Sequence, residues 1–150
     1  MTEFSNDATL PMDVSATPVV RLLELGAHFA LAERAGRMGY WRHQLGEAQP
    51  HWSPGLFAIL GLNPNEVRPS DEFLIERIHP DDRAVVLAGV TAARKMGKAF
   101  CYRSRSWNDG QPERVFETHG DVERAADGRI VALLGVVREV TSEVAAERAL

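Results

Sequence analysis

The apolar residues between Val19 and Arg37 follow a helical period. They recur at spacings of three and four positions, which is typical of a helix with an apolar stripe. Gly36 and Gly39 follow, and glycine commonly ends helices. The pattern predicts one long helix near the N-terminus, whose stripe consists of Val20, Leu23, Ala27, Leu31 and Ala35, widened by Leu22, Leu25 and Phe29.

The pattern predicts shorter elements between residues 38 and 97. Ser53 suits the N-cap of a helix, and Pro54 suits the first helical position, where a missing N–H has no cost. Asp81 and Asp82 suit a helix N-terminus because negative charge is favourable at the positive end of the helix dipole. The expected elements are strands over residues 38–45 and 51–52, and helices over residues 53–61, 71–78 and 80–96.

The remaining sequence predicts three strands joined by tight turns. Asp109-Gly110 and Asp127-Gly128 are typical turn pairs, and the segment after the second pair is dense in β-branched residues. We expect strands over residues 100–107, 113–123 and 129–140, and a helix from Ser142. The predicted fold is α+β: a five-stranded antiparallel sheet, covered on one face by the short middle helices, whose other face the first helix can cover.

Length and composition fit a single domain. The 150 residues are 45% hydrophobic and 25% charged, as in ordinary globular proteins. Residues 1–18 contain few large apolar side chains, so we expect a flexible tail. The expected organisation is this tail, a flanking helix over 19–37, a core over 38–141 and the start of a C-terminal helix over 142–150.

Charge and hydropathy argue against several classes of partner. The net charge of -4 gives no electrostatic reason to expect nucleic acid or an anionic membrane. No segment has the roughly 18 consecutive apolar residues of a membrane helix, and the N-terminus lacks a signal-peptide pattern. The single cysteine, Cys101, cannot form an internal disulfide. We therefore expect a soluble, cytoplasmic protein.

Several short motifs together resemble one family. They are Gly39-Tyr40-Trp41, Trp52-Ser53, Leu60-Gly61-Leu62, Ile78-His79-Pro80-Asp81-Asp82-Arg83, Tyr102-Arg103, Asp109-Gly110 and Gly135-Val136-Val137-Arg138-Glu139-Val140-Thr141. Each is weak alone, but their order and spacing make residues 35–141 resemble the PAS family, especially its members in bacterial histidine kinases and cyclic-dinucleotide enzymes. The family usually ends its last strand with Asp-Ile-Thr, where this chain has Glu139-Val140-Thr141.

The resemblance implies a sensory or protein-interaction module of a two-component system. Such a module catalyses nothing itself and passes a signal through its flanking helices to a histidine kinase or a similar partner. The alternatives are a small-molecule carrier and a purely structural dimerisation domain. A carrier predicts a polar, titratable pocket, whereas the pocket residues expected here are nearly all apolar.

The resemblance also implies a small pocket between the sheet and the short helices. Alternation places Leu133, Gly135 and Val137 on one face of the last strand, and the family pattern turns this face inward. Gly135 is expected to leave space there. A small apolar ligand is one interpretation, and a packed core, the usual origin of apolar stripes, is the other. The candidate lining residues are Trp41, Leu56, Phe57, Leu60, Phe73, Val86, Val90, Phe100, Tyr102, Leu133, Gly135 and Val137.

The residue types disfavour two cofactors known in the family. A covalent flavin needs a cysteine on a short covering helix, but residues 71–78 contain none and Cys101 lies on a strand, expected to face away from Trp41. Haem needs a histidine on the long helix, but residues 80–96 contain none, and His79 is expected to cap or pack. The histidines show no metal-ligand spacing, and no nucleophile elbow or phosphate loop indicates catalysis.

The flanking helices are the candidate signal elements. Glu139, Val140 and Thr141 are predicted to tie the last strand to the C-terminal helix. The alternative, which is compatible with this role, is an ordinary strand end with Thr141 or Ser142 as the helix N-cap. The stripe of the first helix is a candidate homodimer seam, and packing onto the chain's own sheet is the alternative. The seam residues are Val20, Leu23, Ala27 and Leu31.

Overall fold

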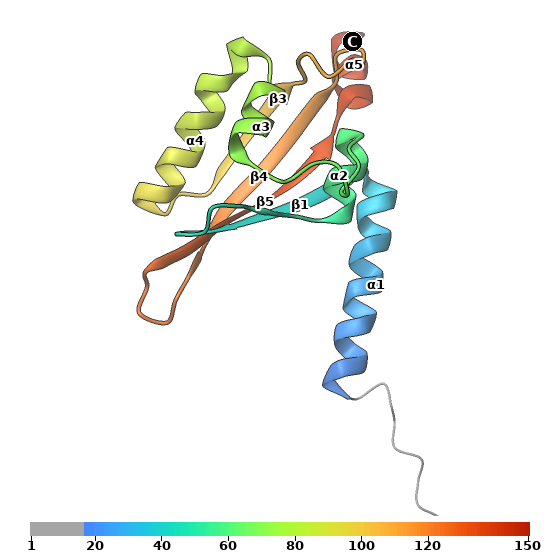
Figure 1. Cartoon of the computed structure of the whole chain (residues 1–150). Helices are drawn as coiled ribbons and strands as arrows, with labels where there is room; N and C mark the ends of the chain where they lie inside the picture. Colours follow the sequence, from blue (N-terminus) through green and yellow to red (C-terminus); the bar gives the residue numbers. More distant parts are fainter. Residues whose placement is uncertain (1–16) are drawn as a thin grey trace, which may run out of the picture.

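The structure, a computed structural model, describes residues 17–150 (Figure 1). Most of the predicted N-terminal tail therefore lies outside the described residues. The predicted fold class is confirmed, and the element boundaries lie within two residues of those expected, except that the helix expected over residues 80–96 is divided into a short 3-10 helix and an α-helix that begins at Arg83. The elements are α1 (Pro18–Gly36), β1 (Met38–Gln44), β2 (His51–Trp52), α2 (Pro54–Leu60), α3 (Asp71–Glu76), the 3-10 helix η2 (Pro80–Asp82), α4 (Arg83–Met96), β3 (Phe100–Arg105), β4 (Val115–Arg124), β5 (Ile130–Glu139) and α5 (Thr141–Arg148).

The five strands form one antiparallel sheet in the order β2-β1-β5-β4-β3. The central strand, β5, pairs with β1 on one side and β4 on the other, so Gly135 lies between Trp41 and Gly120. Gly128 closes the hairpin between β4 and β5 with φ +86°, a conformation that favours glycine. The last three strands are thus the consecutive meander that the turn pairs predicted.

Ser53 fixes α2 against β1. Its Oγ accepts hydrogen bonds from the backbone N of Leu56 (3.3 Å) and of Tyr40 (2.9 Å). The same hydroxyl donates to the carboxylate of Glu33, which connects α2 to α1. One side chain therefore acts as the predicted N-cap and joins three elements.

Helices α2, α3 and α4 lie over one face of the sheet (Figure 1). The larger buried cluster lies below α2 and consists of Trp52, Leu56, Phe57, Phe116 and Val137. A smaller cluster of Val115, Val140 and Val144 holds α5 at the start of β4.

Helix α1 does not cover the other face of the sheet, so that prediction is wrong. Figure 1 shows α1 projecting away from the sheet. Its contacts come from its C-terminal half, where Glu33 is buried and the ring of Phe29 lies 6.0 Å from that of Tyr40. The large apolar side chains of α1 that remain more than half exposed are Val19, Leu22, Leu23, Leu25 and Leu31.

The outer face of the sheet explains why α1 leaves it. Alternation turns charged side chains outward, and they pair across strands: Arg42 Nε lies 2.9 Å from Glu123, and Arg103 Nε lies 2.9 Å from Glu117. Burying these groups beneath an apolar helix would remove their hydration. The charged pairs therefore oppose burial of this face beneath α1.

Two residues expected at helix N-termini have other partners. Asp82 lies in η2 and makes no capping bond to α4; its carboxylate binds Arg105, with oxygens 3.0 Å from Nε and 2.9 Å from Nη2. Thr141 Oγ1 accepts from the backbone N of Val115 (3.0 Å), and α5 has no side-chain cap. The predicted Thr141 or Ser142 cap is therefore wrong, because Thr141 binds the neighbouring strand.

Candidate functional site

A cavity of about 280 Å³ lies between the inner face of the sheet and helices α3 and α4. Strand alternation directs side chains of β1, β3, β4 and β5 toward it. Leu74 and Ile75 of α3 and Val86 and Val90 of α4 form the opposite wall. These elements therefore do not enclose a completely filled core.

Most of the candidate pocket residues come together around this cavity. They derive from five elements and meet because the short helices lie across the sheet. Eight of the twelve line the cavity, namely Trp41, Leu56, Leu60, Val86, Val90, Tyr102, Leu133 and Val137.

The other four candidates lie beside the cavity. The rings of Phe57 and Phe73 pack on Trp52, with centroids 5.4 and 6.2 Å away. Phe100 stacks on Trp41, with centroids 6.3 Å apart. Gly135 leaves no free space, because a Cβ there would lie 2.6 Å from the Trp41 indole. The prediction for Gly135 is therefore wrong: its missing side chain accommodates the tryptophan.

The cavity wall is more polar than the sequence analysis predicted. Ser104, Ser106 and Thr118 are buried there, and a period-two count from Tyr102 or Phe116 could have found them. Charged and titratable side chains also line the wall: His43, Asp71, Arg77, Arg94, Arg105, Asp109 and Arg114.

His43 joins the sheet to α3. Its Nδ1 lies 3.2 Å from Oδ2 of Asp71, and its Nε2 lies 2.8 Å from the carbonyl oxygen of Glu47. Asp71 is the first residue of α3. The contact therefore holds the N-terminal end of α3 beside the cavity.

Two buried donors on the wall have no hydrogen-bond partner within residues 17–150. They are Nε1 of Trp52 and Nε of Arg114. Trp52 is 3% exposed. An unpaired buried donor costs about 1–3 kcal/mol, so such groups usually meet protein, water or a ligand.

Tyr102 contributes a neutral hydroxyl. Burial raises the pKa of Tyr102 above its ordinary value of 10.0, and a hydrogen bond with Thr118 opposes the shift. Thr118 is its direct partner across β3 and β4. The phenol therefore stays protonated at neutral pH.

The predicted relay residues meet the end of α1. The backbone N of Glu139 donates to the carbonyl oxygen of Arg37 (3.0 Å), the C-cap residue of α1. The Glu139 carboxylate lies 3.9 Å from Nη1 of Arg37 and 3.6 Å from Nη1 of Arg114. Val140 is fully buried, so β5 enters α5 through a fixed position.

Arg114 connects the cavity to this junction, and the sequence analysis missed it. Its Nη1 donates to the carbonyl oxygen of Ile59 (2.6 Å) and its Nη2 to Asp109 (2.9 Å). One guanidinium therefore contacts α2, the loop between β3 and β4, and Glu139. No motif marks this arginine, which falls near the start of the strand expected over residues 113–123.

The residues considered for cofactors lie apart from the cavity. Cys101 is exposed, with its Sγ 3.7 Å from Nε2 of His119 on the outer face of the sheet. Nδ1 of His79 accepts from the backbone N of Asp81 (3.1 Å), so the expected capping role of His79 is confirmed.

Neither a metal site nor a membrane-crossing helix is found in the described part of the chain. Over residues 17–150, no three His, Cys, Asp or Glu side chains gather as a metal would require. Within the same range, no helix combines the length and the hydropathy needed to cross a membrane.

Solved structures with this fold come from sensory proteins. A sensory box histidine kinase/response regulator from Burkholderia thailandensis E264 is 25% identical, with TM-score 0.65 over 81% of this chain and 91% of that one. The N-terminal domain of a diguanylate cyclase with a PAS/PAC sensor from Marinobacter aquaeolei is 20% identical, with TM-score 0.62 over 71% and 97%.

A third similar structure is a longer protein. An RNA-binding light-oxygen-voltage receptor is 23% identical, with TM-score 0.64 over 71% of this chain. The chain spans only 30% of the length of that receptor. No curated protein sequence matches the chain.

The family follows from the sequence match and the fold together. The sequence model of the PAS fold matches residues 49–137, more than half of the chain. The matched region extends from the residues before β2 to β5 and so includes helices α2, α3 and α4 with most of the cavity wall. The chain therefore belongs to the PAS fold family and is a sensory domain similar to those of histidine kinases and diguanylate cyclases.

Proposed function

We propose that this domain reports the state of its cavity to a signalling protein through α1 and α5, without catalysing a reaction itself. The observation that carries the proposal is the position of Arg114. Its guanidinium lines the cavity and lies 3.6 Å from Glu139, whose backbone N–H binds the C-cap of α1.

The contacts of Arg114 supply the physical coupling. A molecule that moves the cavity wall also moves the guanidinium, because Arg114 is bound to both Ile59 and Asp109. Moving it changes the ion pair at Glu139, which immediately precedes the buried Val140 and α5. Packed elements respond to such shifts by changing between discrete arrangements.

The proposed partner is a histidine kinase or a similar output protein. The similarity to domains of such proteins supports this class of partner. The exposed apolar residues of α1 support a helix-mediated contact, either with that partner or in a homodimer. The candidate seam remains Val20, Leu23, Ala27 and Leu31.

Filling the cavity tests the proposal without knowledge of the ligand. Val90 of α4 is half-buried and lines the cavity, so Val90→Trp places an indole in or against that space. We expect amide hydrogen exchange in the last turn of α1 and the first turn of α5 to change by about threefold or more. The matched control is Val85→Trp, because Val85 is 59% exposed on the same helix and does not line the cavity.

Equal exchange of these two turns in Val90→Trp, Val85→Trp and the wild type would contradict the relay. Amide hydrogen exchange within α4 serves as the internal reference, because a tryptophan at position 90 must alter the packing around α4. The stability of both variants is measured by denaturation, so that a global effect is separated from a local one.

A small-molecule carrier is the second candidate function. The polar groups on the cavity wall favour it, since a carrier was expected to have a polar, titratable pocket. A carrier needs no coupling to flanking helices. The exchange measurement therefore distinguishes the two functions, because a carrier leaves α1 and α5 unchanged when the cavity is filled.

A further inference from the structure

The size of the cavity limits the molecule that it can hold. A cavity of about 150 Å³ accommodates benzene, and the volume here is about 280 Å³. This space suits a molecule of roughly a dozen non-hydrogen atoms. Most of that molecule must be apolar, because Leu56, Val86, Leu133 and Val137 contribute to the wall.

The charged side chains on the wall are not balanced. Arg105 and Arg114 are each held by an aspartate. Arg77 and Arg94 have no carboxylate within 4.0 Å among residues 17–150, and the one other acidic side chain on the wall, Asp71, faces a histidine. The uncompensated charge of the cavity wall is therefore positive.

Arg77 and Trp52 both pack on the ring of Phe73. The guanidinium carbon of Arg77 is 4.2 Å from the centroid of the Phe73 ring, and the Trp52 ring is 6.2 Å from the same ring. Both residues line the cavity. A cation without a carboxylate and a buried N–H without an acceptor thus lie beside one aromatic ring.

We infer that the cavity binds a small organic acid: an aryl or alkyl body of roughly a dozen non-hydrogen atoms with one carboxylate. The carboxylate accepts a hydrogen bond from Nε1 of Trp52 and pairs with Arg77, which satisfies both groups at once. The inference rests on the proposed function, because it names the class of molecule to which the sensor responds.

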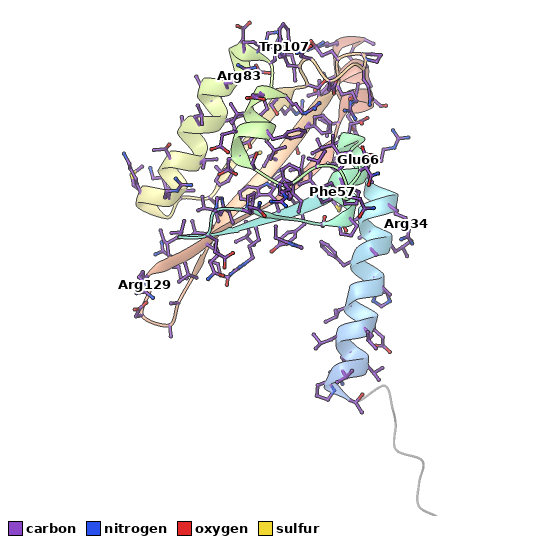
Figure 2. The ribbon with its side chains drawn as sticks, viewed as in Figure 1. Arg34, Phe57, Glu66, Arg83, Trp107 and Arg129 are labelled. Atoms are coloured by element: carbon purple, nitrogen blue, oxygen red, sulfur yellow. The ribbon has the colours of Figure 1, made fainter. Side chains whose placement is uncertain are left out.

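Matched probes test the inference. Phenylbutyrate and decanoate have the inferred size, and phenylbutyramide has the shape of the first without its charge. Calorimetric titration of the full chain is expected to show about tenfold or greater preference for phenylbutyrate over the amide. Arg77→Gln is expected to weaken phenylbutyrate binding about tenfold while leaving amide binding unchanged. Arg129→Gln, at the distant β4–β5 hairpin (Figure 2), is the control and should bind like the wild type.

Trp52→Phe tests the second contact. This variant is expected to weaken the binding of both phenylbutyrate and phenylbutyramide, because each carries an acceptor for the N–H that is lost. Circular dichroism checks that the variant still folds. The wild-type and Arg77→Gln titrations decide the question even if this variant does not fold.

Three results would overturn the inference: equal affinity of the wild type for phenylbutyrate and phenylbutyramide, an equal loss of affinity for both probes in Arg77→Gln, or no binding of any probe. None of these affects the Val90→Trp exchange measurement, which uses no ligand. If the acid binds as expected but filling the cavity leaves α1 and α5 unchanged, the ligand class holds and the relay fails.

Discussion

The absence of a side chain at Gly39 allows β1 and α2 to lie in direct contact. A Cβ at this position would overlap the backbone of Leu56, which cannot move without shifting α2. Gly26 of α1 provides the contrast, because no atom lies within 4 Å of its Cβ position. The same substitution should therefore have opposite effects at the two glycines.

Gly39→Ala is expected to lower the free energy of unfolding by about 1–3 kcal/mol through overpacking. Gly26→Ala is expected to raise it by up to about 1 kcal/mol, since alanine favours helix. Urea denaturation of both variants measures the difference. Wild-type stability in Gly39→Ala would contradict the close approach of α2 to β1.

The Asp82–Arg105 ion pair predicts a pH dependence. The hydrogen bond from Arg105 holds the pKa of Asp82 below its ordinary value of 3.8. The unfolded chain therefore takes up this proton at a higher pH than the folded one. The pair contributes its full stability above about pH 4, and the contribution is lost as the pH falls through the folded pKa.

Asp82→Asn is expected to lower the unfolding free energy by about 1 kcal/mol at neutral pH. Its difference from the wild type should shrink as the pH falls below 3.8 and through the lowered pKa of Asp82 in the folded chain. Thermal unfolding across this range measures the effect, with Asp81→Asn as control because Asp81 is exposed. A difference independent of pH would show that the carboxylate charge is not what stabilises the contact.

The apolar part of the site could be predicted from the sequence, but the polar part could not. Leu133 and Val137 follow from alternation along one strand, which is a local pattern. Arg114 depends on Ile59, Asp109 and Glu139, which lie far apart in the sequence and meet only in the folded chain. Local periodicity carries no information about such a meeting.

At the scale of elements, the contact between α1 and α2 depends on one buried carboxylate. Glu33 is 5% exposed and accepts the hydrogen bond of Ser53, the N-cap of α2. The sequence predicted both helices and their ends, because caps and glycines are local signals. It did not predict this contact, since Glu33 falls on an ordinary helical turn and its partner lies 20 residues away.

Glu33→Ala is expected to destabilise the chain by about 1–3 kcal/mol, because the buried Ser53 hydroxyl loses its acceptor. Amide exchange should also accelerate in the last turns of α1. Glu24→Ala is the matched control, since Glu24 is exposed on the same helix. Unchanged exchange near Glu33 would mean that other contacts hold α1 in place.

At the scale of the whole molecule, α1 leaves one apolar side uncovered. Phe29 contacts Tyr40 and Glu33 contacts α2, so the side of α1 that carries them turns toward the domain. With about 100° per residue, the seam residues Ala27 and Leu31 lie on the opposite side. The alternative that the seam packs on the chain's own sheet is therefore wrong, and a second copy remains the predicted occupant.

The seam predicts which substitution should separate a homodimer. We expect the wild type to sediment as a dimer and Leu31→Glu to weaken association about tenfold or more, because a charge would be buried in the interface. Leu25→Glu is the matched control: Leu25 is 64% exposed, but it lies on the side of α1 that turns toward the domain. Sedimentation velocity over a concentration series measures both, and circular dichroism checks the fold. If Leu25→Glu dissociates the dimer and Leu31→Glu does not, the chain associates through the side of α1 that carries Phe29, and the predicted seam is wrong.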